Sequence, residues 1–116
     1  MQDLEIFVNT LDTTQQDFFW KLHSFLLDIF PFKIKIRYKI PFYDDKIWIC
    51  YLNPLKKGGF ELCFLDGYLL SNAQNLLESK GRKRIKGIII TENTIFPSQA
   101  IIEIIHEVLL IQKLKK

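Results

Sequence analysis

Apolar residues recur at helical spacing in two stretches of the chain. Between Thr13 and Phe30 they fall three or four positions apart, as on one face of a helix, at Phe18, Leu22, Phe25, Leu26 and Ile29. Thr13 and Gln16 have the spacing of a capping box, and Pro31 cannot continue a helix. The pattern predicts a helix over residues 13–30, with one or two helical turns before it, from Leu4 to Val8.

The second helical pattern follows Ser98, which we expect to cap the last helix. Its broad apolar face is formed by Ile101, Ile102, Ile104, Ile105, Val108, Leu109 and Ile111. A basic tail, Lys113–Lys116, follows this face, and cations at the end of a helix interact favourably with its dipole.

Between these helices the stretch Lys33–Ile40 alternates strictly between cationic and apolar residues, which is the period of a strand. The apolar positions, expected to face the core, are Ile34, Ile36, Tyr38 and Ile40. The cations, expected on the opposite face, are Lys33, Lys35, Arg37 and Lys39. We expect Pro41 to break this strand and Asp44-Asp45 to form a turn.

Further apolar runs predict three more strands, Lys46–Leu52, Phe60–Leu65 and Ile85–Thr91, the first two joined by a loop over residues 53–59. Ser71 and Gln74 again have capping spacing, which predicts a short helix that ends at Gly81. The order of elements indicates an α+β sandwich, in which an antiparallel sheet carries the two long helices on one face and a short helix precedes the last strand.

The composition fits a single domain over residues 1–116, because 48% hydrophobic residues can form a core without disulfides. Cys50 and Cys63 lie in different predicted strands without the close Cys/His spacing of a zinc site, so we expect reduced thiols. The first residues do not resemble a signal peptide, and no apolar stretch reaches the ~18 residues of a membrane span. We expect a cytoplasmic protein without a membrane segment.

The positions of the charged residues are more informative than the net charge, which is only +3. One cluster is the cationic face of the first predicted strand, beside which the neighbouring strand places either Trp48 or Tyr51, depending on register. Cations beside exposed aromatics suit a single-stranded nucleic acid, an anionic cofactor or an acidic protein. The alternative is a solvated outer face, since lysines also keep sheets from aggregating.

A second cluster lies in the basic loop, residues 80–86, where the cations are Lys80, Arg82, Lys83, Arg84 and Lys86. Arginine forks suit phosphate or carboxylate, and the backbone at Ser71-Asn72 or the pair Lys56-Lys57 could extend such a site. Cations at the end of a helix are equally expected from the helix dipole alone.

Other chemistry has weaker support. No serine lies in a nucleophile elbow, neither cysteine has a histidine near it in sequence, and no glycine-rich phosphate loop follows a strand. We predict no catalytic residue, no cofactor and no metal site, with an enzyme assembled only in three dimensions as an alternative. The scattered candidate metal ligands are Asp12, Asp17, Asp28, the pair Asp44-Asp45, His23 and His106.

Several motifs together resemble a known family. They are Tyr38–Tyr43, the hairpin Ile49–Asn53 with Lys56–Gly59, and Leu70–Asn72 followed by Leu76–Lys83. Over nearly the whole chain these residues resemble the YdhG-like family of bacterial domains of unknown function. The resemblance implies a frataxin-like sandwich, an intracellular protein and, for some relatives, an iron-chaperone role. It implies no catalytic residues.

We therefore expect a non-catalytic binding domain that engages an anionic small molecule or an acidic protein, with nucleic acid as a less favoured partner. The open sheet face would contribute Lys33, Lys35, Arg37 and Lys39, and the basic loop would contribute Arg82, Lys83 and Arg84. The alternative is an iron-binding protein. We expect a monomer or a weak homodimer, in which Glu61 is the obvious carboxylate to meet the cations of the sheet face.

Overall fold

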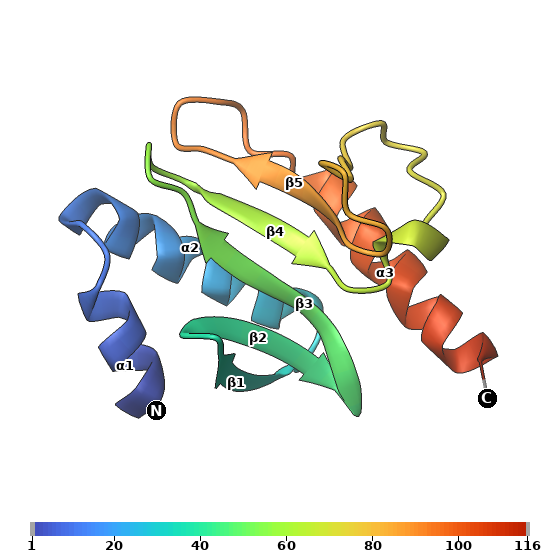
Figure 1. Cartoon of the computed structure of the whole chain (residues 1–116), viewed down its shortest axis with the longest axis horizontal. Helices are drawn as coiled ribbons and strands as arrows, with labels where there is room; N and C mark the ends of the chain where they lie inside the picture. Colours follow the sequence, from blue (N-terminus) through green and yellow to red (C-terminus); the bar gives the residue numbers. More distant parts are fainter. Residues whose placement is uncertain (1, 116) are drawn as a thin grey trace.

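The computed structural model of the chain describes residues 2–115, which form three helices and one five-stranded sheet (Figure 1). The helices are α1 (Gln2–Asn9), α2 (Thr13–Ile29) and α3 (Ser98–Leu114), with a 3-10 turn, η1, at Gly67–Leu69. The strands are β1 (Lys33–Arg37), β2 (Ile40–Asp45), β3 (Ile47–Pro54), β4 (Phe60–Phe64) and β5 (Lys86–Ile90). The predicted α+β class is confirmed.

The sheet is an antiparallel meander in which each strand pairs with its neighbours along the chain, in the order β1-β2-β3-β4-β5. Figure 1 shows α2 and α3 behind the strands, so one face of the sheet is covered by helices and the other faces the viewer. We call the uncovered face the open face. Its strands carry the predicted binding residues.

The core lies between the helices and the sheet. It contains Phe19, Leu22 and Leu26 of α2, Ile101, Ile104 and Ile105 of α3, and the strand residues Tyr43, Leu52, Phe60, Leu62, Phe64, Ile88 and Ile90. The core also holds one polar contact, since His23 Nδ1 lies 2.8 Å from the Tyr43 hydroxyl. This contact links α2 to β2, and burial lowers the pKa of His23.

The predicted strand over residues 33–40 is wrong in its second half. Tyr38 and Lys39 both have positive φ, at 53° and 67°, and form a two-residue turn that joins β1 to β2. Tyr38 therefore lies outside the core with 80% of its surface exposed. Pro41 does not break a strand, because it lies in β2 before the pairing of that strand with β3 begins.

The predicted turn at Asp44-Asp45 is also displaced, because both residues belong to β2 and the chain turns at Lys46, with a φ of 62°. The helix caps differ in a similar way by one residue. Asp12, not Thr13, accepts a hydrogen bond from the Gln15 amide at 2.8 Å, and Pro97, not Ser98, precedes α3.

The predicted helix after Ser71 does not form. Asn72 and Asn75 have positive φ, and the Asn72 side chain bonds the backbone of Leu77, so the asparagines hold an irregular turn. A single bridge between Glu78 and Gly87 attaches this segment to the outer side of β5. The short helical element lies earlier, at η1. Within residues 2–115, no helix is both long and apolar enough to cross a membrane.

Candidate functional site: the open face of the sheet

The strand register decides which residues share the open face. Lys33 lies opposite Asp44 and Lys35 opposite Phe42, so these side chains lie on one face of the β1–β2 pair. Phe42 in turn lies opposite Tyr51 of β3, and Tyr51 lies opposite Cys63 of β4. The cations of β1 therefore share a face with aromatic residues of β2 and β3.

A β-bulge brings both aromatic residues of β3 to this face. Tyr43 pairs with Cys50 and Asp44 pairs with Trp48, so Ile49 is an extra residue without a partner on β2. The bulge interrupts the alternation of side chains, and Ile49 is buried in the core. Trp48 and Tyr51 consequently both contact Phe42, where regular alternation allows only one of them.

The aromatic rings form a continuous cluster. The Phe42 ring lies 4.8 Å from that of Tyr51 in a stacked arrangement, 5.4 Å from Trp48 edge to face, and 6.1 Å from Tyr38. They surround an aromatic hollow of about 490 Å³, lined by Tyr38, Ile40, Phe42, Trp48, Tyr51, Asn53, Leu65 and Ile85. Burial raises the pKa of Tyr51 to about 12, so its phenol is neutral at physiological pH.

Arg37 holds one side of this cluster in place. Its guanidinium makes two parallel hydrogen bonds to Asp44, at 2.9 and 2.7 Å. The same group lies over the Trp48 ring, 4.1 Å from its centroid. The bond to Asp44 raises the pKa of Arg37. The predicted site residue Arg37 is thus already paired, and its role is to orient Trp48 and neutralise a buried carboxylate.

Arg82, in the basic loop, is likewise paired with a buried carboxylate, that of Glu61 on β4. Its guanidinium donates to Glu61 at 2.8 Å, and Lys80 lies 3.7 Å from the same carboxylate, whose residue is only 3% exposed. Burial alone raises the pKa of Glu61, but the hydrogen bond and charge of Arg82 outweigh it, so the pKa lies below its ordinary value. A side chain at Gly87 would clash with this carboxylate, which explains the glycine there.

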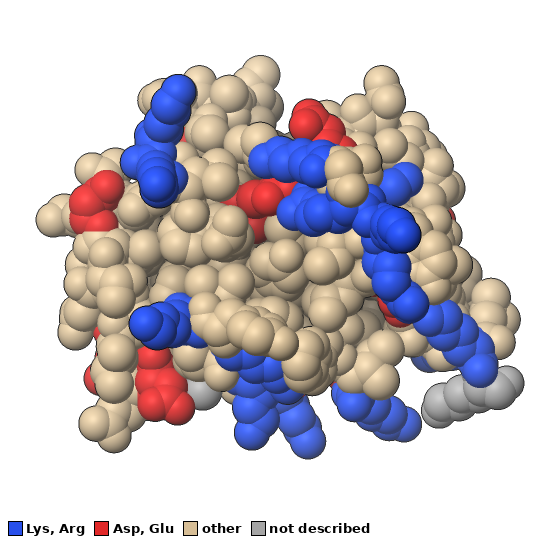
Figure 2. All heavy atoms as spheres, in the orientation of Figure 1, with Lys and Arg blue, Asp and Glu red and all other residues tan. Residues whose placement is uncertain are grey.

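The remaining cations of the predicted site are solvent-exposed lysines and one arginine. Arg84 lies 3.6 Å from Asp66 and over the ring of Tyr68. Lys33, Lys35, Lys39 and Lys83 are exposed, and none of them forms an ion pair with another residue in the range 2–115. Figure 2 shows Lys and Arg side chains at several places on this face, among them a group by β1 and β2 and a group by β4 and β5, with uncharged surface between these two groups.

Sequence reasoning located the cations but missed the carboxylates that pair with two of them. Asp44 was expected in a turn, and Glu61 was considered only as a contact for a second copy of the chain. The exposure of Tyr38 was also missed. A strict alternation that ends in Tyr-Lys before Ile-Pro carries no Asn-Gly or Asp-Gly signal, so it does not reveal the turn.

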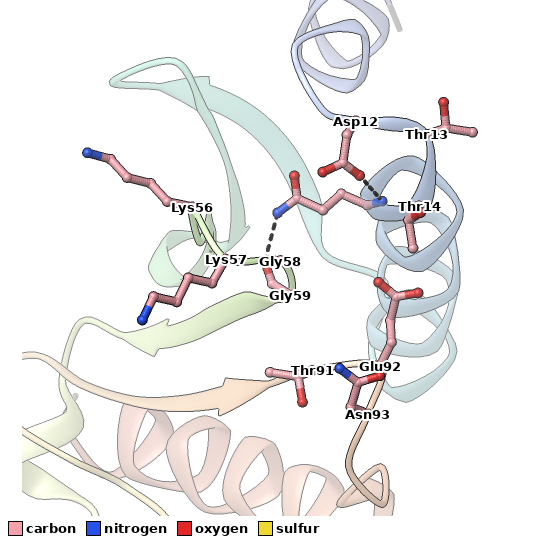
Figure 3. A pocket seen from close by; sticks show the side chains of 11 residues that line it. Asp12, Thr13, Thr14, Lys56, Lys57, Gly58, Gly59, Thr91, Glu92 and Asn93 are labelled. Atoms are coloured by element: carbon pink, nitrogen blue, oxygen red, sulfur yellow. Dashed lines mark hydrogen bonds between the residues drawn. The ribbon is translucent and has the colours of Figure 1, made fainter.

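A separate pocket of about 490 Å³ lies at the start of α2 (Figure 3). Gln15 donates to the carbonyl oxygens of Leu55 and Gly59, at 3.0 and 3.2 Å, and so ties the β3–β4 loop to the helix. Figure 3 shows the amines of Lys56 and Lys57 extending away from the helix, while Asp12 lies beside its first turn. The β3–β4 loop leads into Phe60, which pairs with Ile90 at the end of β5, whereas the basic loop lies at the start of β5. The loop lysines therefore do not extend the basic loop.

The thiols and the histidines do not form a second site. Both cysteines are free and buried, and burial raises the pKa of each, to about 11 for Cys63. His23 packs among the rings of Phe19, Trp20 and Tyr43, whereas His106 is exposed on α3. Among the residues that the structure describes, no three His, Cys, Asp or Glu side chains are grouped closely enough to hold a metal ion.

Comparison with known proteins gives no relative: no protein-family model, no curated protein and no solved structure matches this chain. The resemblance to YdhG-like domains therefore stays a prediction. The open face combines the aromatic cluster with exposed lysines, and it is the candidate binding surface.

Proposed function

We propose that this chain is a non-catalytic cytoplasmic binding domain, which engages an anionic ligand or an acidic partner through the open face of its sheet. The observation that carries the proposal is the charge arrangement on this face. The two buried carboxylates, Asp44 and Glu61, are both neutralised by arginines. Four exposed lysines form no ion pair with a described residue: Lys33, Lys35, Lys39 and Lys83. An anion that approaches this face meets unpaired positive charge.

The contributions of the predicted residues differ. Lys33, Lys35 and Lys83 supply exposed charge, whereas Arg37 and Arg82 form ion pairs with the buried carboxylates Asp44 and Glu61. Lys39 lies in the turn beside Tyr38, and Arg84 forms an ion pair with Asp66. The binding charge therefore comes mainly from the lysines, and the arginines preserve the shape of the surface.

This division of roles decides which variants test the proposal. Replacing Arg82 by a carboxylate would place two negative charges together at a buried position, and the loss of binding would then report misfolding. Lys35→Glu reverses an exposed charge of β1 on the open face, and Lys83→Glu reverses an exposed charge in the basic loop. Lys113→Glu is the matched control, because it reverses an exposed charge on α3, behind the sheet.

Calorimetric titration with tripolyphosphate and with polyglutamate, at low salt, measures the effect. We expect at least one of these polyanions to bind. Lys35→Glu and Lys83→Glu should each weaken its binding by about tenfold, because a repelling charge replaces an attracting one. Added salt should weaken binding further. Equal effects of Lys35→Glu and Lys113→Glu, or no binding of either polyanion, would contradict the proposal. No observation on the described residues favours the iron alternative.

A further inference from the structure

We infer that the ligand of the open face is a single-stranded nucleic acid, an inference that rests on the proposed function. The sequence favoured a small anion or an acidic protein. The arrangement of rings on the sheet reverses that order, because it offers stacking surfaces that neither of those partners needs.

The rings are placed where unstacked bases could reach them. Tyr38 and Trp48 are 80% and 41% exposed, and both line the hollow and contact the buried ring of Phe42. Phe42 is only 3% exposed and already stacks on Tyr51, so it is not available to a base. Tyr38 is the most exposed ring, and Trp48 keeps the side of its ring that Arg37 does not cover. Aromatic side chains on adjacent strands of an open sheet are a recurrent platform on which proteins stack single-stranded bases.

The hollow also offers a polar group for a base edge. Asn53 lines it beside Tyr51, and its side-chain amide makes no hydrogen bond to any of residues 2–115. An amide carries both donors and an acceptor, which is the combination that base edges require. A carboxylate-rich protein could accept a hydrogen bond from this amide, but its carboxylates would leave the two outer rings without a stacking partner.

The cations lie on both sides of the rings, as the backbone of a strand requires. Lys33 and Lys35 are on β1, whereas Lys80 contacts Glu61 of β4. Three interstrand spacings separate these strands, or about 14 Å. One small phosphate cannot touch both groups, but successive phosphates of a strand can. Lysines suit this role because they meet phosphate as point charges without a fixed geometry.

A duplex does not fit the same surface, because its bases are stacked on each other and hide their faces. The ligand class is therefore a strand with exposed bases. Its affinity should combine two contributions, phosphate contacts that weaken with salt and ring stacking that depends on the bases.

Trp48 reports the contact by its fluorescence once the other tryptophan is replaced. Trp20 lies on α2, so Trp20→Phe gives a protein in which emission comes from the open face alone. We expect an oligothymidylate to quench this emission. An abasic strand with the same number of phosphates should bind at least about tenfold more weakly, because it cannot stack.

Ring variants separate stacking from charge. Tyr38→Ala should weaken oligothymidylate binding by about tenfold, and Tyr38→Phe should retain it, because the phenyl ring still stacks. Ile95→Ala is the matched control, since Ile95 is 95% exposed in the loop between β5 and α3 and should change nothing. All three variants replace exposed side chains, so none should alter the fold.

Four outcomes overturn the inference. They are equal binding of the abasic strand, equal binding of a matched duplex, binding of thymidine monophosphate as tight as that of the strand, and no binding of oligothymidylate. If polyglutamate or tripolyphosphate binds in a Lys35-dependent way while the oligothymidylate does not, the inference fails and the proposed function stands. If none of the three binds, both fail.

Discussion

Arg82 shows how a cation expected to bind a ligand serves the fold. Its guanidinium neutralises the Glu61 carboxylate, which is almost fully buried beside β5. Arg82→Ala would leave that charge with only Lys80, at 3.7 Å. We expect the free energy of unfolding to fall by about 2–4 kcal/mol, measured by urea denaturation.

Lys83 provides the control for this prediction, because it is the neighbouring cation and is exposed. Lys83→Ala should change stability by less than about 0.5 kcal/mol. The double variant Arg82→Ala, Glu61→Gln removes the buried charge and should recover part of the loss. Equal stability of the Arg82 and Lys83 variants would show that the ion pair does not support the face.

His23 makes stability depend on pH. Burial lowers the pKa of His23 below its ordinary value of 6.5, so the unfolded chain takes up a proton at a higher pH than the folded chain. This contribution to stability is fully present above pH 6.5 and is lost as the pH falls toward the folded pKa.

We therefore expect the free energy of unfolding to decrease as the pH falls from about 6.5 to 5.5. His23→Gln should flatten that dependence, whereas His106→Gln, at an exposed position on α3, should retain it. Unfolding by urea at a series of pH values measures both variants. A wild-type stability that is constant over this window would contradict the burial of a neutral His23.

At the scale of elements, the β1–β2 hairpin presents Tyr38 through a turn made of two residues that rarely adopt positive φ. Lys39 has a φ of 67°, a conformation that costs glycine nothing. We expect Lys39→Gly to raise the free energy of unfolding by up to about 1 kcal/mol. Lys35→Gly, which removes the same charge from the middle of β1, should lower it by about 0.5–1 kcal/mol.

Thermal or urea denaturation of the two glycine variants distinguishes these expectations. The two variants carry the same net charge. Changes of opposite sign in their free energies of unfolding would therefore reflect the backbone conformation at each position. If both variants lose stability equally, the turn at Tyr38-Lys39 is not as described.

The sequence predicts most elements of this fold because their patterns are long or strongly periodic. The helices α2 and α3 and the strands β3, β4 and β5 lie within about one or two residues of their predicted bounds, the usual uncertainty of helix and strand ends. The failures occur where single residues adopt rare conformations. Tyr38 and Lys39 form a turn within a stretch of regular alternation. Asn72 holds an irregular turn where a helix capped by Ser71 was predicted.

The open face was predicted only in part for a related reason. Alternation places the cations of β1 correctly, because it is a local property of one strand. The arginine–carboxylate pairs and the bulge at Ile49 depend on how strands meet, which a single strand does not encode. The prediction that either Trp48 or Tyr51 lies on this face assumed regular pleating, and the bulge places both there.

At the scale of the whole molecule, the sheet has one open face and one face covered by helices (Figure 1). The open face carries exposed lysines around an uncharged centre, and the two long helices cover the other side of the sheet (Figures 1 and 2). The predicted monomer or weak homodimer stays a prediction. Glu61 is held by Arg82 and is almost fully buried, so it is a poor contact for the lysines of a second copy.

The claim that the open face is the binding surface is tested most directly by mapping amide chemical shifts during a titration with the polyanion that binds, tripolyphosphate or polyglutamate. We expect the largest changes at Lys33, Lys35, Trp48 and Lys83, and little change along the exposed side of α3. Changes centred on the loop of Lys56 and Lys57 and the start of α2, or spread evenly over the molecule, would contradict the account.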